Sequence, residues 1–339
     1  MKLNNKILII GGNRINEKNP LNTIFNVLKK QNLNFEFITS SIHLNKPYRK
    51  KSKFKDYLKS KSIKYKLINS YGQLYFYLEK ISKKFNIIIL LSHSTFIFKN
   101  DIIKLVKKRI FNYHLGSLPE QRGGAPGSWQ TLMSKKSTKM TIHKVTDKID
   151  RGNIVLTKLI NINKDQTLKK FYSNVRIFEY NFFINFFKKL NKKKIEKKQN
   201  EKKSIYMPRL STKAHGYINW SWSGEEIYNF IRSFDFPFGG ARTYLNGKEV
   251  IIGKVKLIKK RFKFHPFQSG IIFRKEKDFY LIACKGYSIK TNYIKNSKGK
   301  IVKDRLLGKR LYTPYSVLDK SMTSVSIQSP SKDLIQKKF

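Results

Sequence analysis

Residues 6–40 read KILIIGGNRINEKNPLNTIFNVLKKQNLNFEFITS, and this stretch decides the fold class. Two short apolar runs, Lys6–Gly12 and Phe35–Ser40, enclose the segment Pro20–Gln31, where a proline stands at the first turn of an expected helix. A strand, a helix and a second strand in this order predict two parallel strands joined by a crossover helix. Gly11 and Gly12 follow the first strand without the G-x-G-x-x-G spacing of a dinucleotide site.

The same alternation continues to about residue 160. Further apolar runs of strand length are Lys64–Asn69, Asn86–Ser92, Arg109–His114, Met140–Val145 and Asn153–Ile160. We therefore predict an α/β fold with a doubly wound, mostly parallel sheet and helices on both faces. A long helix is expected over residues 165–194. Its three- and four-residue spacing of apolar side chains indicates core packing for Leu168, Phe171, Val175, Phe178, Phe182 and Phe186.

The second half of the chain has a different pattern. A short helix is expected over Ser221–Phe234, where Ser223 and Glu226 have capping-box spacing. Short β-like runs follow, and Asn246-Gly247 between two of them is typical of a hairpin. Together they predict a small β-barrel-like (OB-like) domain, with Trp220 and Trp222 as anchors of its core. The predicted division is an N-terminal α/β domain at 1–194, a charged linker at 195–205, a β-rich domain at 206–318 and a flexible tail at 319–339.

The chain of 339 residues is strongly basic, with 72 Lys and Arg against 21 Asp and Glu and a formal charge of +51. Nucleic-acid binding is one interpretation. Compositional drift is the favoured one, because the basic clusters are spread along the whole sequence. The single cysteine, Cys284, excludes an intramolecular disulfide and a multi-thiolate zinc site. No apolar run approaches the roughly 18 residues of a membrane helix, so we expect a cytoplasmic protein without a membrane partner.

Three side chains carry the predicted chemistry. Asn112 and His114 lie two residues apart at the end of an expected strand, so they point to the same side. Asp150 lies in the loop between the next two strands. An amide and an imidazole can donate hydrogen bonds to the oxyanion of a tetrahedral intermediate. A histidine held by a carboxylate can accept a proton from an attacking amine. Because Ser117 has no separate base, direct transfer to an amine is favoured over an acyl-enzyme.

Several residues have two interpretations. Asp147 is an alternative to Asp150 as the catalytic carboxylate, although only Asp150 lies just ahead of a glycine in the turn. His93 and His143 lie near expected strand ends and suggest a metal site with His114 and Asp150. We expect none, because the spacing is not a ligand motif and the transfer needs no metal.

Two further residues after His114 each have two interpretations. Arg122 either binds a phosphate of an acceptor or forms an ion pair that stabilises the loop. Trp129 either stacks on a base or a sugar, or packs in the core on the helix that follows, which is favoured.

The motifs NYHLGSLPEQRGGAP (112–126) and KIDRGNIV (148–155) resemble the signature of the folate-dependent formyltransferases. That family has an Asn-x-His pair, a Ser-Leu-Leu-Pro-x-x-Arg-Gly loop and an aspartate in a Leu-Asp-x-Gly turn. YMPRL (206–210), INWSWSGEEIYNFIRSF (218–234), ARTYLNGKEV (241–250) and LLGKRLYTP (306–314) resemble the C-terminal extension of methionyl-tRNA formyltransferases and nucleotide-sugar N-formyltransferases. The resemblance covers nearly the whole chain.

The resemblance implies a formyltransferase-like Rossmann domain, a catalytic set of Asn112, His114 and Asp150, and 10-formyltetrahydrofolate as co-substrate. The residues expected near the folate are Leu91, Ser92, His93, Phe96, Ile97, Val145, Thr146 and Asp147. Those expected to line the acceptor site are Ser117, Leu118, Pro119, Arg122, Gly123 and Gly124.

The expected acceptor is a primary amine. Three alternatives are open for the function: two different acceptors and a protein without catalytic activity. Two segments differ in sequence from the corresponding segments of the tRNA enzymes: the loop Gly123–Trp129 and the end of the first strand, Gly11–Arg14. These differences favour a nucleotide-linked amino sugar as the acceptor. Initiator methionyl-tRNA would give the basic surface a use. A non-catalytic RNA-binding relative is the third alternative, and the intact Asn, His and Asp set argues against it. The sequence gives neither the sugar nor the oligomeric state.

Overall fold

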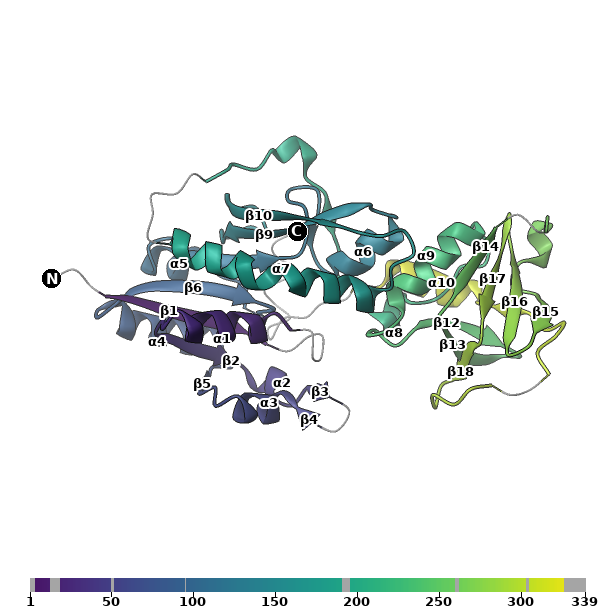
Figure 1. Cartoon of the computed structure of the whole chain (residues 1–339), viewed down its shortest axis with the longest axis horizontal. Helices are drawn as coiled ribbons and strands as arrows, with labels where there is room; N and C mark the ends of the chain where they lie inside the picture. The colour runs from purple at the N-terminus through teal and green to yellow at the C-terminus, as the bar shows by residue number, and fades with distance from the viewer. Residues whose placement is uncertain are drawn as a thin grey trace.

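The computed structural model describes residues 4–12, 19–49, 52–94, 96–190, 196–259, 262–302 and 305–325. Part of the Gly11–Arg14 motif and residues 326–339 of the predicted tail lie outside these ranges. The described chain forms an α/β domain and a smaller domain of antiparallel strands, which lie side by side along the long axis (Figure 1).

The α/β domain contains a seven-stranded sheet of order β10-β9-β7-β6-β1-β2-β5. Its strands are β1 (Asn5–Gly11), β2 (Phe35–Thr39), β5 (Tyr65–Leu67), β6 (Asn86–Ser92), β7 (Ile110–His114), β9 (Ser137–Lys144) and β10 (Ile154–Asn161). The first five are parallel, whereas β9 runs antiparallel to both β7 and β10. The mostly parallel sheet is therefore confirmed, with every expected strand present.

Helices cover both faces of this sheet. The helices of this domain are α1 (Leu21–Lys30), α2 (Ser41–Leu44), α3 (Phe54–Ser60), α4 (Tyr71–Ser82), α5 (Asn100–Leu105), α6 (Pro126–Leu132) and α7 (Leu168–Lys189). Side chains of α1 and α7 share one buried apolar cluster, and those of α4 and α5 share the cluster on the other face. A small hairpin, β3 (Pro47–Arg49) with β4 (Ser52–Lys53), lies beside α3.

The apolar stripe of α7 packs in the core with one exception. Phe178 is 39% exposed, so its prediction as a core residue is wrong. The next residue, Glu179, is buried instead: its carboxylate accepts hydrogen bonds from Tyr113 Oη at 3.0 Å and from Thr23 Oγ1 at 3.4 Å. A polar residue thus continues the buried face of the helix where a hydroxyl partner from β7 is available.

Glu179 makes the stability of the protein depend on pH. Burial raises the pKa of this carboxyl group from 4.5 to about 7, against the lowering effect of Tyr113. The folded state therefore holds the proton more tightly than the unfolded chain, and this contribution is lost as the pH rises through about 7. We expect Glu179→Gln to gain stability relative to the wild type between about pH 5 and pH 8 in urea unfolding. Parallel pH profiles for the two proteins would contradict this assignment.

The C-terminal domain has two four-stranded antiparallel sheets, ordered β18-β13-β12-β19 and β14-β17-β16-β15. Its strands are β12 (Ala241–Leu245), β13 (Lys248–Gly253), β14 (Lys256–Lys259), β15 (Ile272–Glu276), β16 (Phe279–Cys284), β17 (Tyr287–Thr291), β18 (Tyr293–Asn296) and β19 (Leu311–Tyr312). The predicted hairpin at Asn246-Gly247 joins β12 to β13. Trp220 is buried and its indole N–H donates to Thr243 Oγ1, as expected for an anchor of this domain.

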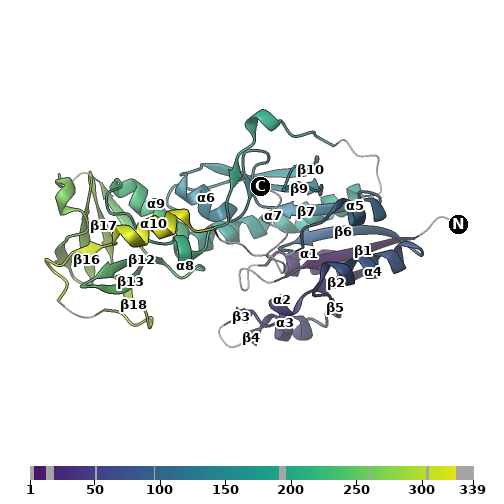
Figure 2. The same ribbon diagram turned by 180° about the vertical axis from the view of Figure 1, so that it is seen from behind.

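The α-helices in the described residues of the C-terminal part are α8 (Thr212–His215), α9 (Gly224–Phe234) and α10 (Tyr315–Thr323). α9 begins at the predicted capping box of Ser223 and Glu226. α10 returns to α8 near the junction of the two domains (Figure 2). Within the described residues, no helix combines the length and apolar character needed to cross a membrane.

Candidate active site

The carboxyl end of β7 and the loop between β9 and β10 bring the predicted set together. Asn112 and His114 leave β7 on one side, and Tyr113 between them turns to the opposite side, toward Glu179. Asp150 lies in the β9–β10 loop with a φ of 50°. Its Oδ1 is 3.3 Å from Asn112 Nδ2, and its Oδ2 is 3.6 Å from His114 Nδ1. The convergence expected from the sequence is therefore present.

The hydrogen bonds of His114 determine its tautomer. Nε2 lies 2.6 Å from the carbonyl oxygen of Gln121, so this nitrogen carries a hydrogen and donates it. In the neutral ring the lone pair is then on Nδ1, the nitrogen that faces Asp150. A proton accepted at Nδ1 would therefore lie between the imidazole and a carboxylate.

The pKa values of both ionisable groups, His114 and Asp150, are lowered in this cluster. Burial lowers the pKa of His114, although the negative charge of Asp150 opposes this shift. Burial alone would raise the pKa of Asp150, but its interactions with His114 and His143 and the backbone N–H of Gly123 lower it well below its usual range. Near neutral pH the site thus contains an ionised carboxylate beside a neutral imidazole.

His143 is a fourth member of the cluster that the sequence suggested only as a metal ligand. It lies on β9 directly opposite Asn112 in the sheet and is 2% exposed. Its Nδ1 donates to the Lys144 carbonyl at 2.7 Å. Its Nε2 is 3.2 Å from Asn112 Nδ2 and 3.2 Å from Asp150 Oδ1. The sequence does not encode this contact locally, because it depends on the register in which β9 pairs with β7.

We expect His143→Leu to lower kcat by about 10- to 100-fold, because the Asn112 amide and the Asp150 carboxylate lose a shared partner and their orientation. The measurement is steady-state kinetics of this variant, of Asn112→Ala and of the double variant. If His143 acts through Asn112, the double variant is no slower than Asn112→Ala alone. Fully multiplicative effects of the two substitutions would contradict this role.

Two glycines allow the chain to approach Asp150 closely. Gly123, at φ 99°, donates its backbone N–H to Asp150 Oδ2 at 2.9 Å, and a Cβ there would lie 2.3 Å from the carbonyl oxygen of Met207. A Cβ on Gly152 would lie 1.9 Å from the Lys144 carbonyl oxygen. Side chains at either position would displace the backbone that holds the carboxylate.

Segment 196–207 packs along the α/β domain, and Arg122 attaches it. Strand β11 (Tyr206–Met207) pairs in parallel with β8 (Arg122–Gly123). The Arg122 guanidinium is 2% exposed and donates to Gln199 Oε1, both carboxylate oxygens of Glu201 and Ser204 Oγ. Gln199 in turn donates to the carbonyl oxygens of Asp150 and Gly152 at 2.8 and 2.7 Å. These contacts favour the ion-pair interpretation of Arg122 over phosphate binding.

Arg122→Leu is expected to lower the free energy of unfolding by about 3 kcal/mol, because the buried polar groups around it lose a charged hydrogen-bond donor. Urea unfolding followed by circular dichroism measures this loss. Arg151→Gln is the matched control, since its side chain is 46% exposed and lies 3.8 Å from the same Glu201. An exposed pair of this kind contributes little. Equal stability of the two variants would contradict the assignment.

The cluster opens into a cavity of about 270 Å³. Asn112, His114 and Asp150 line it, as do Gly123 and Gly124 from the predicted acceptor set and His93 from the predicted folate set. Arg209 and Leu210 form another part of its wall. The cavity therefore lies between the predicted catalytic set and the segment that leads into the C-terminal domain.

The other residues predicted to bind folate or acceptor do not line this cavity. Leu91 and Ser92 are buried in β6, and Phe96 and Val145 pack against the apolar cluster beneath the sheet. Thr146 and Asp147 precede Asp150 in its loop, and Ile97 lines a neighbouring pocket. Leu118 and Pro119 are buried, whereas Ser117 is half-buried and its backbone N–H donates to Gln121 Oε1. Trp129 lines the neighbouring pocket rather than the core.

No cluster of His, Cys, Asp or Glu in the described ranges has the arrangement of a metal site. Cys284 is buried, and burial raises the pKa of its thiol to about 12. His93 lines the cavity and His143 contacts Asn112 and Asp150, and neither belongs to a metal-ligand cluster within the described residues.

Comparisons with known proteins agree with this geometry. Residues 16–187 match the family model described as formyl transferase, and residues 210–309 match the model of the formyl transferase C-terminal domain. The predicted catalytic residues 112, 114 and 150 all lie within the first match.

Two curated relatives align with the N-terminal half. The bifunctional polymyxin resistance protein ArnA of Wigglesworthia glossinidia brevipalpis is 33% identical over 168 residues, which are 49% of this chain and 26% of that protein. The methionyl-tRNA formyltransferase of Thermodesulfovibrio yellowstonii is 28% identical over 162 residues, 48% of this chain and 52% of that protein. The alignments thus span about half or less of the length of these relatives.

A solved structure shares the fold over most of the chain. It is an N-formyltransferase from Helicobacter canadensis in complex with folinic acid and dTDP-3-aminofucose. The TM-score is 0.64 at 20% identity, and the match covers 86% of this chain and 98% of that one. At this identity the likeness concerns the fold.

Proposed function

The chain belongs to the formyl transferase family, and from this membership we propose that it transfers the formyl group of 10-formyltetrahydrofolate to a primary amine. The observation that carries the proposal is the convergence of Asn112, His114 and Asp150 on one cavity. The folate is proposed to lie along the segments 91–97 and 145–147, next to the wall that His93 contributes.

The proposed transfer uses each group of the cluster. The amine nitrogen attacks the formyl carbon, and the carbonyl electron pair moves to the oxygen, where the Asn112 amide donates a hydrogen bond. His114 accepts the proton of the attacking nitrogen at Nδ1, and Asp150 stabilises the resulting imidazolium. Collapse of the intermediate breaks the bond from the formyl carbon to N10 of the folate, and the proton from His114 passes to N10. The products are a formamide and tetrahydrofolate.

Asn112 must exchange partners during this step. Its Nδ2 faces two acceptors, Asp150 Oδ1 and His143 Nε2. A substrate oxygen therefore replaces one of these two contacts, and the other holds the amide in place.

For the acceptor we propose the amino group of a nucleotide-linked sugar. The departures of the loop Gly123–Trp129 from the tRNA enzymes support this choice, and the Helicobacter canadensis enzyme of the same fold was solved with dTDP-3-aminofucose. Initiator methionyl-tRNA is the second candidate, because a methionyl-tRNA formyltransferase is among the relatives and the chain is strongly basic.

The deciding experiment offers radiolabelled 10-formyltetrahydrofolate with charged initiator tRNA and with a panel of amino-sugar nucleotides in parallel. Label in a sugar nucleotide with turnover well above that on tRNA would support the proposal. Label on tRNA alone would transfer the assignment to the second candidate. Label on neither, with intact folate binding, would refute both acceptors.

A further inference from the structure

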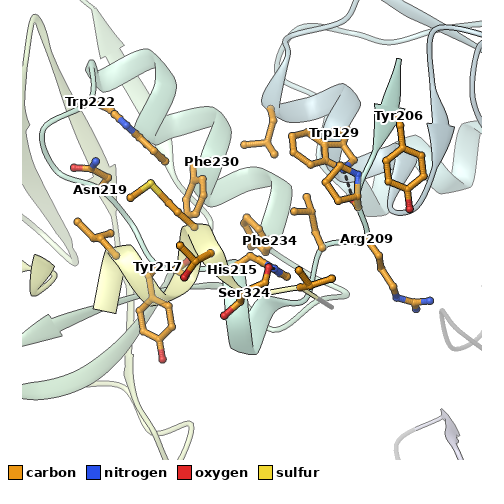
Figure 3. Close-up of a pocket in the computed structure, with 18 of the residues that line it drawn as sticks. Trp129, Tyr206, Arg209, His215, Tyr217, Asn219, Trp222, Phe230, Phe234 and Ser324 are labelled. Carbon is orange, nitrogen blue, oxygen red and sulfur yellow. Dashed lines mark hydrogen bonds between the residues drawn. The ribbon is translucent and has the colours of Figure 1, made fainter. Parts of the chain in front are cut away.

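A second cavity, of about 720 Å³, lies between the two domains next to the catalytic cavity (Figure 3). Its volume is in the range of small-molecule sites. Rings from α6, from the segment 206–222 and from α9 surround it: those of Trp129, Tyr206, Tyr217, Trp222, Phe230 and Phe234. Aromatic side chains that face an open space offer stacking surfaces for a flat ring.

α10 closes one side of this pocket. Leu318 and Met322 line it, and Met322 is 71% exposed. His215 holds this wall in place: its Nδ1 accepts the Ser211 N–H at 2.8 Å, and its Nε2 donates to the Ser324 carbonyl at 2.9 Å. α10 lies beyond residues 210–309, the match to the C-terminal family model, so this wall is formed by a part of the chain outside both family matches.

Arg209 connects the pocket to the catalytic cavity. Arg209 and Leu210 line both spaces. Figure 3 shows the Arg209 side chain extending away from the Phe230 and Phe234 rings. Within the described ranges this half-buried guanidinium has neither a hydrogen bond nor an ion pair, and burial lowers its pKa to about 10, so it remains charged. A desolvated cation without a carboxylate attracts an anion, and the planar guanidinium fits a phosphate.

These features have a fixed order in space. The amine-transfer cluster comes first, then a cation at the junction, then a pocket of aromatic rings. A nucleotide-linked amino sugar has the same order, with an amine, a diphosphate and a flat base. Resting on the proposed function, we propose that the pocket walled by α10 binds the nucleoside of the acceptor and that Arg209 binds its diphosphate. The p-aminobenzoyl-glutamate end of the folate, which also combines a ring with anions, is the competing occupant.

The first test measures binding without catalysis. Titration calorimetry uses the full chain with dTDP or UDP, which lack the amine and the sugar. The variants are Trp129→Leu and Arg209→Gln, and the matched controls are Phe267→Leu and Arg274→Gln, whose side chains are 73% and 44% exposed in the C-terminal domain. We expect each pocket variant to weaken nucleotide binding by about 10- to 100-fold, and the controls to bind as the wild type does. Wild-type protein that binds neither nucleotide would overturn the proposal.

The second test separates the two occupants. For the amino-sugar nucleotide that the wild type formylates, the pocket variants should raise the acceptor KM by the same factor, with kcat and the folate KM unchanged. A raised folate KM with an unchanged acceptor KM would assign the pocket to the folate and overturn the inference. If the wild type formylates no sugar nucleotide, the proposed function fails, and the calorimetry still decides whether this pocket binds a nucleoside diphosphate.

Discussion

Replacing His114 with alanine is expected to lower kcat by about 10²- to 10⁴-fold, the range that one general base contributes. The neighbouring His143 does not replace this base, since its Nε2 already contacts the Asn112 amide at 3.2 Å. His114 is 6% exposed and its Nε2 donates to Gln121, so some stability will also be lost. The measurement is the single-turnover rate at saturating formyl donor and amine.

Two controls separate catalysis from folding in this experiment. His114→Gln keeps a polar side chain in the buried site but supplies no base, so it should lose as much activity as the alanine variant while its unfolding midpoint stays nearer the wild type. His265→Ala removes an exposed histidine of the C-terminal domain and should keep full activity. Near-normal turnover by His114→Gln would refute the proposed mechanism.

Replacing Asp150 with asparagine is expected to lower kcat by about 10³-fold or more, because the imidazolium at 114 loses its counter-charge and the contacts that orient the cluster are disturbed. Oδ1 accepts from the Asn112 amide and Oδ2 accepts from the Gly123 N–H, and His143 Nε2 lies 3.2 Å from Oδ1. An asparagine amide has one acceptor oxygen and one donor nitrogen. Its nitrogen would therefore face an N–H donor that the carboxylate oxygen now accepts, and that hydrogen bond would be lost.

The pH dependence provides a second readout for Asp150. The carboxylate raises the pKa of His114 against the effect of burial. Without its charge the pKa of His114 falls further, so the residual activity should decline at a lower pH than in the wild type. The exposed Asp278, changed to asparagine, is the matched control and should leave the profile unchanged. An acidic limb that does not move would show that Asp150 does not act through His114.

The structure also explains why both sides of β7 matter. Asn112 and His114 point toward Asp150, while Tyr113 between them donates to Glu179 and its ring packs edge-on against Phe183 at 5.1 Å. Tyr113 and Glu179 also line the cavity. The alternation of a strand thus directs two residues to the Asp150 cluster and the residue between them to α7. These contacts with residues of α7 fix the position of the carboxyl end of β7.

The sequence by itself determined the order of strands and helices, because each alternation of apolar side chains depends only on neighbouring residues. It also determined that Asn112 and His114 share a side and that Asp150 stands in a turn. These are local properties of an extended strand and of a glycine-containing loop, and the structure agrees with them.

Only the tertiary structure decided which distant residues complete the site. His143 contacts Asn112 because β9 pairs antiparallel with β7 in one register, and a shift by a single residue would turn it to the other face. Arg122 forms hydrogen bonds with Glu201 and Gln199, which are nearly eighty residues away in the sequence. Glu179 is accommodated in the core because Tyr113 donates a hydrogen bond to it. Such pairings depend on how whole elements pack, and no local period in the sequence encodes them.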